Sequence, residues 1–105
     1  MAEDFGLVSI IMAAFNAEKT IECAVNSVLG QTFKGFELIV VDDCSTDKTA
    51  EIVESFAEKD KRVRLLENKE NRGVSLTRKR GLEEARGGWI AILDSDDAWA
   101  PEKLE

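Results

Sequence analysis

Short apolar runs alternate along the chain with segments in which apolar residues recur every three or four positions. The runs cover residues 7–13, 36–41, 62–66 and 89–93, and each has the length of a strand. The segments between them have the period of an α-helix that packs against a sheet. This β-α-β-α order predicts an α/β fold with three layers, α/β/α, around a mainly parallel sheet.

Each helical segment has an apolar stripe that predicts its inward face. The first helix is expected to begin at Asn16, a good N-cap residue, and its stripe is Ile21, Ala24, Val25, Val28 and Leu29. The second helix is expected to pack through Ile52, Val53, Phe56 and Ala57 and to turn toward water Glu51, Glu54, Glu58 and Lys59. The third begins after Asn71-Arg72-Gly73, and its stripe is Val74, Arg78, Gly81, Leu82 and Ala85.

Arg78 is the charged member of an otherwise apolar stripe. Burying it alone would cost several kcal/mol, roughly the penalty for an unpaired ion in a protein interior. Two interpretations remain. The simpler one is that the side chain extends outward to water, and the other is that it meets carboxylates or a phosphate.

The order of the strands follows from the handedness of their connections. Right-handed crossovers predict the order 3-2-1-4, in which the first and fourth strands flank the point where the order reverses. Ligands bind at such points, beyond the carboxyl ends of the strands. Residues 13–15, 42–43 and 94–96 would meet there. The fourth strand, residues 89–93, has five consecutive apolar residues and is expected to be buried on both faces.

Composition limits the chemistry and the partners. The 105 residues are enough for one domain or part of one, and their net charge of −7 argues against non-specific binding to nucleic acid or to an anionic membrane. Histidine is absent from the sequence, which excludes Ser-His-Asp and Cys-His catalysis within this chain.

Cysteine usage and hydropathy bear on the compartment. Cys23 and Cys44 have neither a C-x-x-C spacing nor the density of a disulfide scaffold, so two reduced thiols of a cytoplasmic protein are expected. The longest apolar stretch near the N-terminus, residues 7–15, is too short to span a membrane. We expect neither a signal peptide nor a transmembrane helix.

The acidic run Asp94-Ser95-Asp96-Asp97 follows the fourth strand directly. An isolated D-x-D is most often a surface turn. However, the chain has no G-x-G-x-x-G after its first strand and no P-loop motif, so a phosphate in the crevice needs another source of positive charge. Mg²⁺ or Mn²⁺ held by Asp94 and Asp96 would supply it, because carboxylate oxygens suit hard divalent cations.

Four segments together resemble the successive signatures of the family-two inverting glycosyltransferases, which have the GT-A fold. They are Val8-Ser9-Ile10-Ile11-Met12-Ala13-Ala14-Phe15-Asn16, Val41-Asp42-Asp43-Cys44-Ser45-Thr46-Asp47-Lys48-Thr49, Asn71-Arg72-Gly73 through Arg78, and Leu93-Asp94-Ser95-Asp96-Asp97. They occur in the family's order and spacing over essentially the whole chain. The resemblance implies the Rossmann-like half of a GT-A fold.

The resemblance implies a nucleotide-sugar donor site made of Ala13, Phe15, Glu18, Asp43, Arg78, Asp94 and Asp96. Ala13 would line the base pocket, Phe15 would stack beside the base and Asp43 would hydrogen-bond it. Asp94 would lie near the ribose, and Asp96, with Asp94, would ligate Mg²⁺ or Mn²⁺. Glu18 would be an acidic position near the base and Arg78 an arginine of the donor site.

The chain departs from the family pattern in two residues and in length. Cys44 stands where glycine is common, and Lys79 where asparagine is frequent. The pattern of the family continues past Glu105 into an acceptor half that carries the general base. Residues 1–105 are therefore expected to be the nucleotide-sugar-binding portion, truncated or excised, of an enzyme that transfers a sugar to an acceptor hydroxyl with inversion, and to be inactive alone. The catalytic base is not assignable.

The partners and alternatives follow from the same residues. A glycan or lipid-linked acceptor is implied for the full enzyme, as is a cytoplasmic location, peripheral at the inner face of the membrane. Self-association is expected through the fourth strand, which the predicted order leaves as an uncovered edge. A receiver-type phosphoacceptor domain and a non-catalytic nucleotide-binding or assembly module remain as alternatives.

Overall fold

The centre of the molecule is a sheet of four parallel strands. In the computed structural model, which describes residues 7–96, they are β1 (Val8–Ala14), β2 (Phe36–Asp42), β3 (Val63–Glu67) and β4 (Trp89–Ile92). Their order is β3-β2-β1-β4, and every pair is parallel. The predicted order is confirmed, so the carboxyl ends of all four strands meet at one edge of the sheet.

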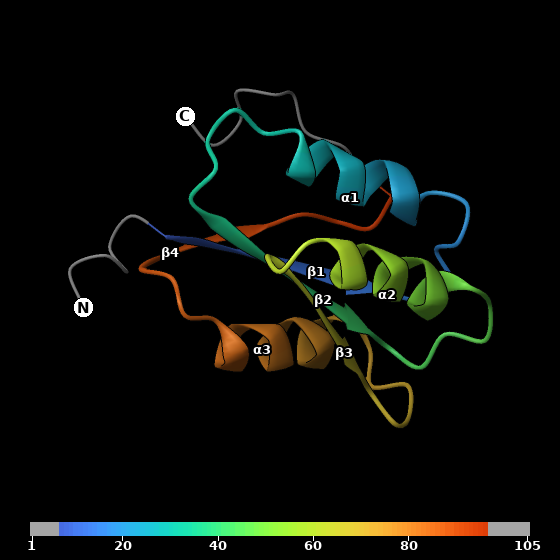
Figure 1. The fold of residues 1–105 in the computed structure, drawn as a ribbon. Coiled ribbons are helices and arrows are strands. Elements are labelled where there is room, and N and C mark those ends of the chain that lie inside the picture. The colour runs from blue at the N-terminus through green and yellow to red at the C-terminus, as the bar shows by residue number, and fades with distance from the viewer. Residues whose placement is uncertain (1–6, 97–105) are drawn as a thin grey trace.

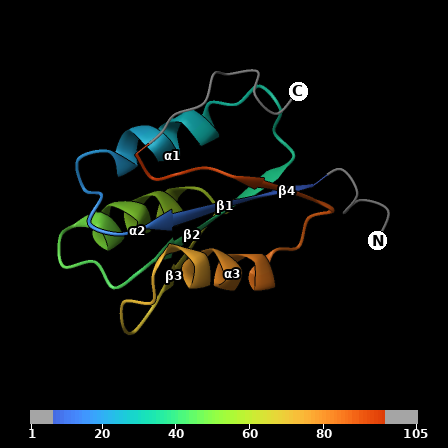
Figure 2. The ribbon, with the colours of Figure 1, turned by 180° about the vertical axis from the view of Figure 1, so that it is seen from behind.

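Helices cover both faces of the sheet. α1 (Ile21–Leu29) and α2 (Thr49–Lys59) lie on one face and α3 (Val74–Glu84) lies on the other, as the two opposite views show (Figure 1, Figure 2). The predicted three-layer α/β/α arrangement is therefore confirmed. Among the described residues, the helices are too short and too polar to span a membrane.

Alternate residues of each strand divide the core in two. Ile10 and Met12 of β1 point toward α1 and α2, where the larger cluster also contains the predicted stripe of α1. Ile11 points toward α3, into a smaller cluster with Ile39 and Val41. All five side chains are fully buried. The helix pair α1–α2 is thus held by a larger apolar core than α3 is.

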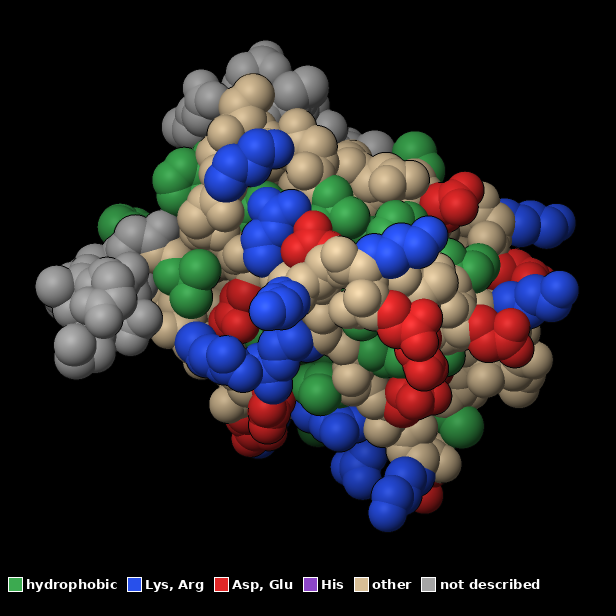
Figure 3. Space-filling model, in the orientation of Figure 1, with side chains coloured by type: hydrophobic (Ala, Val, Ile, Leu, Met, Phe, Trp, Pro, Cys, Tyr) green, Lys and Arg blue, Asp and Glu red, His purple; other side chains and the backbone are tan. Residues whose placement is uncertain are grey.

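The outward face of α2 agrees with the prediction, since its three glutamates are exposed. Figure 3 shows acidic side chains over α2 and basic ones beside its C-terminal end. This face of the molecule therefore presents both signs of charge side by side, although the chain as a whole is acidic.

The inward face of α3 differs from the predicted stripe. Its buried residues are Thr77 and Gly81, whereas Val74 and Leu82 are 54% and 44% exposed. A Cβ at Gly81 would lie 2.6 Å from Cγ2 of Ile11, so the backbone of α3 approaches the sheet through this glycine. The stripe was right at Gly81 and at Ala85, which packs against the smaller core cluster, and wrong at Val74 and Leu82, because close backbone approach rather than apolar side chains orients this helix.

The loop after β1 also differs from the expectation. Asn16 is not a helix cap: its φ is 48°, in the left-handed region, and its Oδ1 accepts a hydrogen bond from the Thr46 N–H at 2.8 Å. α1 begins at Ile21, with Thr20 at the N-cap position. Asparagine favours both helix caps and left-handed turns, and here the second preference applies.

The expectation that the fourth strand is buried on both faces was wrong. Trp89, Ile90 and Ile92 of β4 are 66%, 47% and 42% exposed. Among the described residues β4 pairs only with β1, on one side, so it is an edge strand. A continuous apolar run does not distinguish a buried central strand from an exposed edge strand.

Candidate functional site

Two adjoining cavities lie where the strand order reverses, beyond the carboxyl ends of β1 and β4. The Asp43 cavity has a volume of about 320 Å³ and is lined by Ala13, Ala14, Phe15, Asp43, Asn71, Gly73, Val74 and Thr77. The Asp94 cavity has a volume of about 510 Å³ and is lined by Ala13, Phe15, Asn16, Ala17, Thr20, Val74, Arg78, Asp94, Ser95 and Asp96. Three residues are common to both, Ala13, Phe15 and Val74, so the cavities form one crevice.

The structure brings six of the seven predicted site residues to this crevice. They are Ala13, Phe15, Asp43, Arg78, Asp94 and Asp96. Glu18 is the exception: its side chain is exposed and lines neither cavity, and its backbone N–H donates to Oδ2 of Asp47 at 3.2 Å. Its place near a base stays a prediction.

Phe15 stands on a loop that is tied to the loop after β2. The Asn16 N–H donates to Oγ of Ser45 at 2.9 Å, and the Ala17 N–H donates to Oγ1 of Thr49 at 2.8 Å. The Phe15 side chain is nevertheless 49% exposed. An aromatic ring on a braced loop that faces a cavity offers a fixed stacking surface for a planar ligand.

Asp43 is buried, with 4% of its surface exposed, and its carboxylate accepts several hydrogen bonds. Oδ1 accepts from the Arg72 N–H at 2.8 Å and from Nδ2 of Asn68 at 2.8 Å, while Oδ2 accepts from the Gly73 N–H at 2.9 Å. Arg72 and Gly73 precede α3 directly, and Gly73 is its N-cap residue. Asp43 therefore holds the N-terminus of α3, where the helix dipole favours an anion.

These contacts keep the Asp43 carboxyl ionised. Burial raises its pKa, but the hydrogen bonds from the two backbone N–H groups and the Asn68 amide outweigh burial, so the pKa lies below its ordinary value. Each carboxylate oxygen can accept two hydrogen bonds. Oδ1 accepts two of these bonds and Oδ2 one, and the Thr77 hydroxyl, which also lowers the pKa, bonds the same carboxylate.

Its neighbour Asp42 has a different role. Asp42 is 2% exposed and lines neither cavity; its carboxylate accepts from the Ser45 N–H at 3.0 Å and from the Ser45 hydroxyl. It thus braces the turn after β2. Cys44, at the centre of that turn, has a φ of 60°, which explains why glycine suits this position.

Arg78 meets the acidic run, which resolves the two interpretations of its place on α3. Its Nη2 lies 2.6 Å from Oδ1 of Asp94 in a partly exposed ion pair. Its Nε is buried, with no hydrogen-bond partner in the described part of the chain. A buried donor without a partner costs about 1–3 kcal/mol.

The turn that carries Asp94 and Asp96 is anchored at Leu93 and at Ser95. The Leu93 N–H donates to the Ile11 carbonyl at 3.1 Å, and the Thr20 hydroxyl donates to the Ser95 carbonyl at 3.0 Å. Both aspartates are exposed and line the Asp94 cavity. The turn therefore presents two carboxylates on a fixed backbone.

These two carboxylates suit a cation that a ligand helps to hold. Among residues 7–96 no group of three or more His, Cys, Asp or Glu side chains is placed to hold a metal ion by itself. Mg²⁺ commonly binds through only one or two carboxylates together with water and the phosphates of a substrate. The donor set fits such a shared site and does not fit a closed structural one.

Several residues of the crevice were missed by sequence reasoning. Val74 lines both cavities, Thr20 anchors the acidic turn, and Asn68 links Asp43 to the Thr77 hydroxyl through bonds of 2.8 and 3.0 Å. The segment Asn71-Arg72-Gly73 through Arg78 gave a signal that includes Val74, and the φ of 88° at Gly73 accounts for the glycine; Thr20 and Asn68 gave none.

A third cavity, of about 460 Å³, is lined by residues of α3 and of the segment from the end of β3 to Arg72. Its lining includes Lys69, Arg72, Lys79 and Arg80 together with Glu67 and Glu83. None of the predicted site residues belongs to it.

Comparison of the sequence with known proteins gives one family. Residues 9–105 match the family model of glycosyl transferase family 2. WfgD of Escherichia coli, a UDP-Glc:alpha-D-GlcNAc-diphosphoundecaprenol beta-1,3-glucosyltransferase, is 48% identical over 99 residues, which are 94% of this chain and 38% of WfgD. The succinoglycan biosynthesis protein ExoO of Rhizobium meliloti is 44% identical over 97 residues, which are 92% of this chain and 27% of ExoO. The chain thus spans well under half the length of either relative.

Solved structures agree with the sequences. Residues 1–349 of S. aureus TarS, in complex with UDP-GlcNAc, superpose with a TM-score of 0.87 at 37% identity, over 92% of this chain and 28% of that one. The mannosyltransferase PcManGT of Pyrobaculum calidifontis, in complex with GDP-Man and Mn²⁺, gives a TM-score of 0.83 at 30% identity, over 90% and 29%. The sheet and helices described above are those of a GT-A glycosyltransferase, and the chain belongs to glycosyl transferase family 2.

Proposed function

We propose that residues 1–105 are the nucleotide-sugar-binding portion of a metal-assisted glycosyltransferase that inverts the configuration of the transferred sugar. One observation carries the proposal: a single crevice has a stacking ring and a buried carboxylate at one end and an arginine with two aspartates at the other. A nucleoside diphosphate has the same polarity, with a planar base at one end and two phosphates at the other.

The Asp43 cavity is proposed to take the base. Phe15 stacks against it, Ala13 leaves room for the ring, and the Asp43 carboxylate, which lines this cavity, receives an N–H of the base. Because Asp43 is ionised and already oriented by its donors, it selects a donor edge on the ligand. The imide of uracil and the amide and amino groups of guanine both present such an edge.

The Asp94 cavity is proposed to take the ribose and the diphosphate. Asp94 accepts from a ribose hydroxyl, and Arg78, which lines this cavity, donates to a phosphate oxygen. The ion pair between these two side chains keeps both oriented before the ligand arrives. A donor that is already positioned loses less entropy on binding.

Asp96, with Asp94, is proposed to hold Mg²⁺ or Mn²⁺ together with the diphosphate. The bound cation supplies Lewis-acid stabilisation of the charge that develops on the departing nucleoside diphosphate. The side chains hold their part of this site through the backbone anchors of Leu93 and Ser95, so the carboxylates need little reorganisation.

In the whole enzyme the acceptor hydroxyl is proposed to attack the anomeric carbon directly, so that the bond to the nucleotide breaks on the opposite side and the configuration inverts. No residue of this chain is assigned as the general base. It is expected in the part of the family's length that this chain does not span. The acceptor is proposed to be a glycan or a lipid-linked sugar, in keeping with the lipid-linked substrate that the name of WfgD states.

The proposal includes a location and an assembly. A lipid-linked acceptor calls for an enzyme that is cytoplasmic and peripheral at the inner face of the membrane. The exposed edge of β4, with Trp89 66% exposed and Ile90 47% exposed, is proposed to pair with a second copy of the 105-residue chain.

Calorimetric titration with UDP and GDP tests the donor site. We expect binding in the presence of Mn²⁺ that weakens when EDTA replaces the metal, and Asp96→Ala should remove the Mn²⁺-dependent part. Loss of one ligand to the metal should weaken binding by about one to two orders of magnitude, the value of about 1.5–3 kcal/mol for a bond to a charged group. Glu54→Ala, an exposed carboxylate on α2, is the matched control and should change nothing.

Two results would contradict the proposal. Equal affinity with Mn²⁺ and with EDTA refutes the metal role of Asp94 and Asp96, and absence of binding in both refutes the idea that these residues suffice for the donor. Binding without sugar transfer by the full-length protein would favour the non-catalytic module.

Asp43 is better tested through the ligand, because it also holds α3. Ribose 5-diphosphate, which lacks the base, should bind more weakly than UDP.

A further inference from the structure

Glu37 is a buried carboxylate at the end of the sheet opposite to the crevice. It is the second residue of β2, and 7% of its surface is exposed. Its Oε2 accepts from the Ser9 hydroxyl at 2.6 Å and from the Arg86 N–H at 2.7 Å. None of the donor-site roles proposed above uses it, so its burial needs another explanation.

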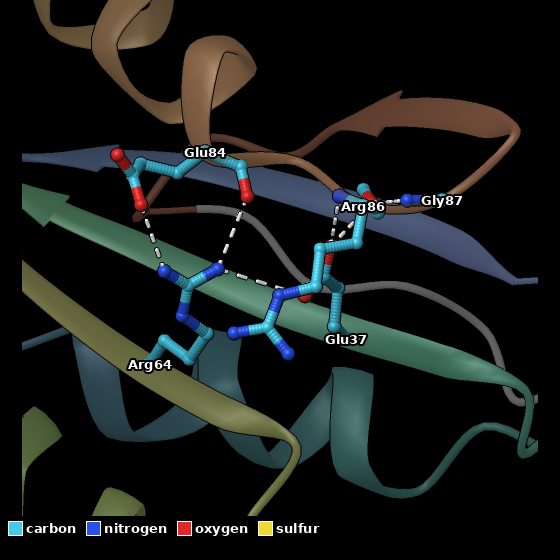
Figure 4. Close-up of polar contacts among 6 residues, drawn as sticks. Glu37, Arg64, Glu84, Arg86 and Gly87 are labelled. Carbon is cyan, nitrogen blue, oxygen red and sulfur yellow. Dashed lines mark hydrogen bonds and ion pairs between the residues drawn. The ribbon is translucent and has the colours of Figure 1, made fainter.

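The contacts of Glu37 connect β1, β2 and β3 with the segment that leads into β4. Ser9 of β1 also accepts from the Gly87 N–H at 2.8 Å, and Arg64 of β3 forms an ion pair with Oε1 of Glu37 at 3.8 Å. Arg64 in turn donates to the carbonyl of Glu84 at 3.1 Å and to its Oε1 at 2.9 Å, at the last residue of α3 (Figure 4). We call Ser9, Glu37, Arg64 and Glu84 the Glu37 cluster.

This cluster receives the chain where it leaves α3 and enters β4. The Arg86 and Gly87 N–H groups both point to it, as Figure 4 shows. Gly87 has no room for a side chain, because a Cβ would lie 2.5 Å from the Leu7 carbonyl and 2.8 Å from Oγ of Ser9. The segment before β4 is thus held by two hydrogen bonds, one to the Glu37 carboxylate of β2 and one to the Ser9 hydroxyl of β1.

Besides these bonds, β4 is held by the Trp89 N–H, which donates to the Leu7 carbonyl at 3.4 Å, and at its far end by the buried Leu93, whose N–H donates to the Ile11 carbonyl at 3.1 Å. Within the described part of the chain β4 pairs with β1 alone, over four residues, and three of its four side chains are exposed. A one-residue slip would turn every side chain of a strand to the other face. The contacts at residues 86 and 87 select the register in which Val8 lies beside Trp89 and Ile11 beside Ile92.

We infer that Glu37 is a positioning residue for the metal-binding aspartates. By holding the start of β4 it sets where the strand delivers Asp94 and Asp96, about 16 Å farther along at about 3.3 Å per residue. Through Arg64 and Glu84 it also holds the end of α3, the helix that carries Arg78. The inference rests on the proposed function for its metal readout, and on the geometry of β4 alone for its structural one.

The test compares Glu37→Leu, which has no acceptor for Ser9, the Arg86 N–H or Arg64, with the parent by two measurements. The first is amide hydrogen exchange, followed by NMR, at Leu93, whose N–H bonds to the Ile11 carbonyl, and at Asn68, whose N–H bonds to the Asp42 carbonyl. The second is the affinity for Mn²⁺ in the presence of UDP. We expect exchange at Leu93 to quicken about tenfold while exchange at Asn68 is unchanged, and Mn²⁺ to bind about tenfold more weakly, as for other residues that orient metal ligands.

Asp60→Asn is the control for the loss of a paired carboxylate. Asp60 also forms an ion pair, with Arg62 at 2.7 Å, but its side-chain contacts with Arg62 are confined to the segment before β3. It should change neither the exchange at Leu93 nor the affinity for Mn²⁺. If Glu37→Leu does not fold, Ser9→Ala carries the test, since it removes the bond to the Gly87 N–H and leaves the charge of Glu37 in place.

The outcomes separate the possibilities. Exchange at Leu93 equal to that of the parent overturns the inference, and so does faster exchange with unchanged Mn²⁺ affinity. An equal loss of Mn²⁺ affinity in Asp60→Asn would show a general effect of stability and would overturn it too. A parent chain that binds no Mn²⁺ refutes the proposed metal site instead, and exchange at Leu93 then decides whether Glu37 positions β4.

Discussion

Replacing Asp43 by asparagine should destabilise the fold strongly, although the two side chains have the same shape. The amide oxygen can take the place of Oδ1 and keep the bonds from Arg72 and Asn68. The amide NH₂ then faces the Gly73 N–H, and two donors stand 2.9 Å apart. Leaving that donor unmatched costs about 1–3 kcal/mol, and the two surviving bonds lose about 1 kcal/mol each when their acceptor is no longer charged.

The expected loss is therefore about 3–5 kcal/mol in the free energy of unfolding, a large share of the roughly 5–15 kcal/mol of a typical domain. It should depend on pH in a defined direction. The pKa of Asp43 is lower in the folded chain than its ordinary value of 3.8, so the carboxylate stabilises the fold above that value. This stabilisation is lost as the pH falls through the folded-state pKa.

Urea unfolding followed by circular dichroism, at pH 7 and again at pH 3, measures both effects. The difference between Asp43→Asn and the parent should be full at pH 7 and smaller at pH 3. Glu54→Gln, on the exposed face of α2, is the control and should stay within about 0.5 kcal/mol of the parent at both. A difference at pH 7 below about 1 kcal/mol, the value of a single ordinary hydrogen bond, would refute the reasoning, as would a difference that does not change with pH.

Three further predictions address α3, the turn after β2 and the edge of the sheet. Gly81→Ala should lower the free energy of unfolding by about 1–3 kcal/mol, because its Cβ would lie 2.6 Å from Cγ2 of Ile11; an unchanged melting temperature would contradict this. Cys44→Gly should raise it by up to about 1 kcal/mol, because φ is 60° at that residue, and a loss of stability in thermal unfolding would disagree. Trp89→Lys should reduce the self-association of the 105-residue chain measured by light scattering, and a parent that stays monomeric at high concentration would rule that association out.

Most of the fold could be predicted because it depends on rules that act on patterns. The order β3-β2-β1-β4 follows from right-handed crossovers, and the inward face of α1 follows from the spacing of its apolar residues. The edge position of β4 follows from that order, whereas the exposure of its side chains could not be predicted, since an apolar run looks the same in a buried strand and in an exposed one. The turn at Asn16 was missed because its partner, Thr46, lies on another loop.

The site was predictable in its side chains and not in its backbone contacts. Asp94 and Asp96 lie at the crevice because they follow a strand that ends there, and strand ends can be located from sequence. The bonds from the Arg72 and Gly73 N–H groups to Asp43 were not predictable, because almost every residue carries a backbone N–H and the pattern gives no sign of which one is used. The same holds for the Arg86 N–H and Glu37.

These backbone contacts have a common consequence for α3. The helix buries only Thr77 and Gly81, so apolar packing contributes less to its position than it does for α1. Its two ends are held instead by carboxylates of β2 or of the residue that follows it: Asp43 at the N-terminus, and Glu37, through Arg64, at the C-terminus. Because hydrogen bonds are directional where apolar contacts are not, α3 is fixed in orientation with little buried area, and Arg78, which it carries, keeps its place opposite Asp94.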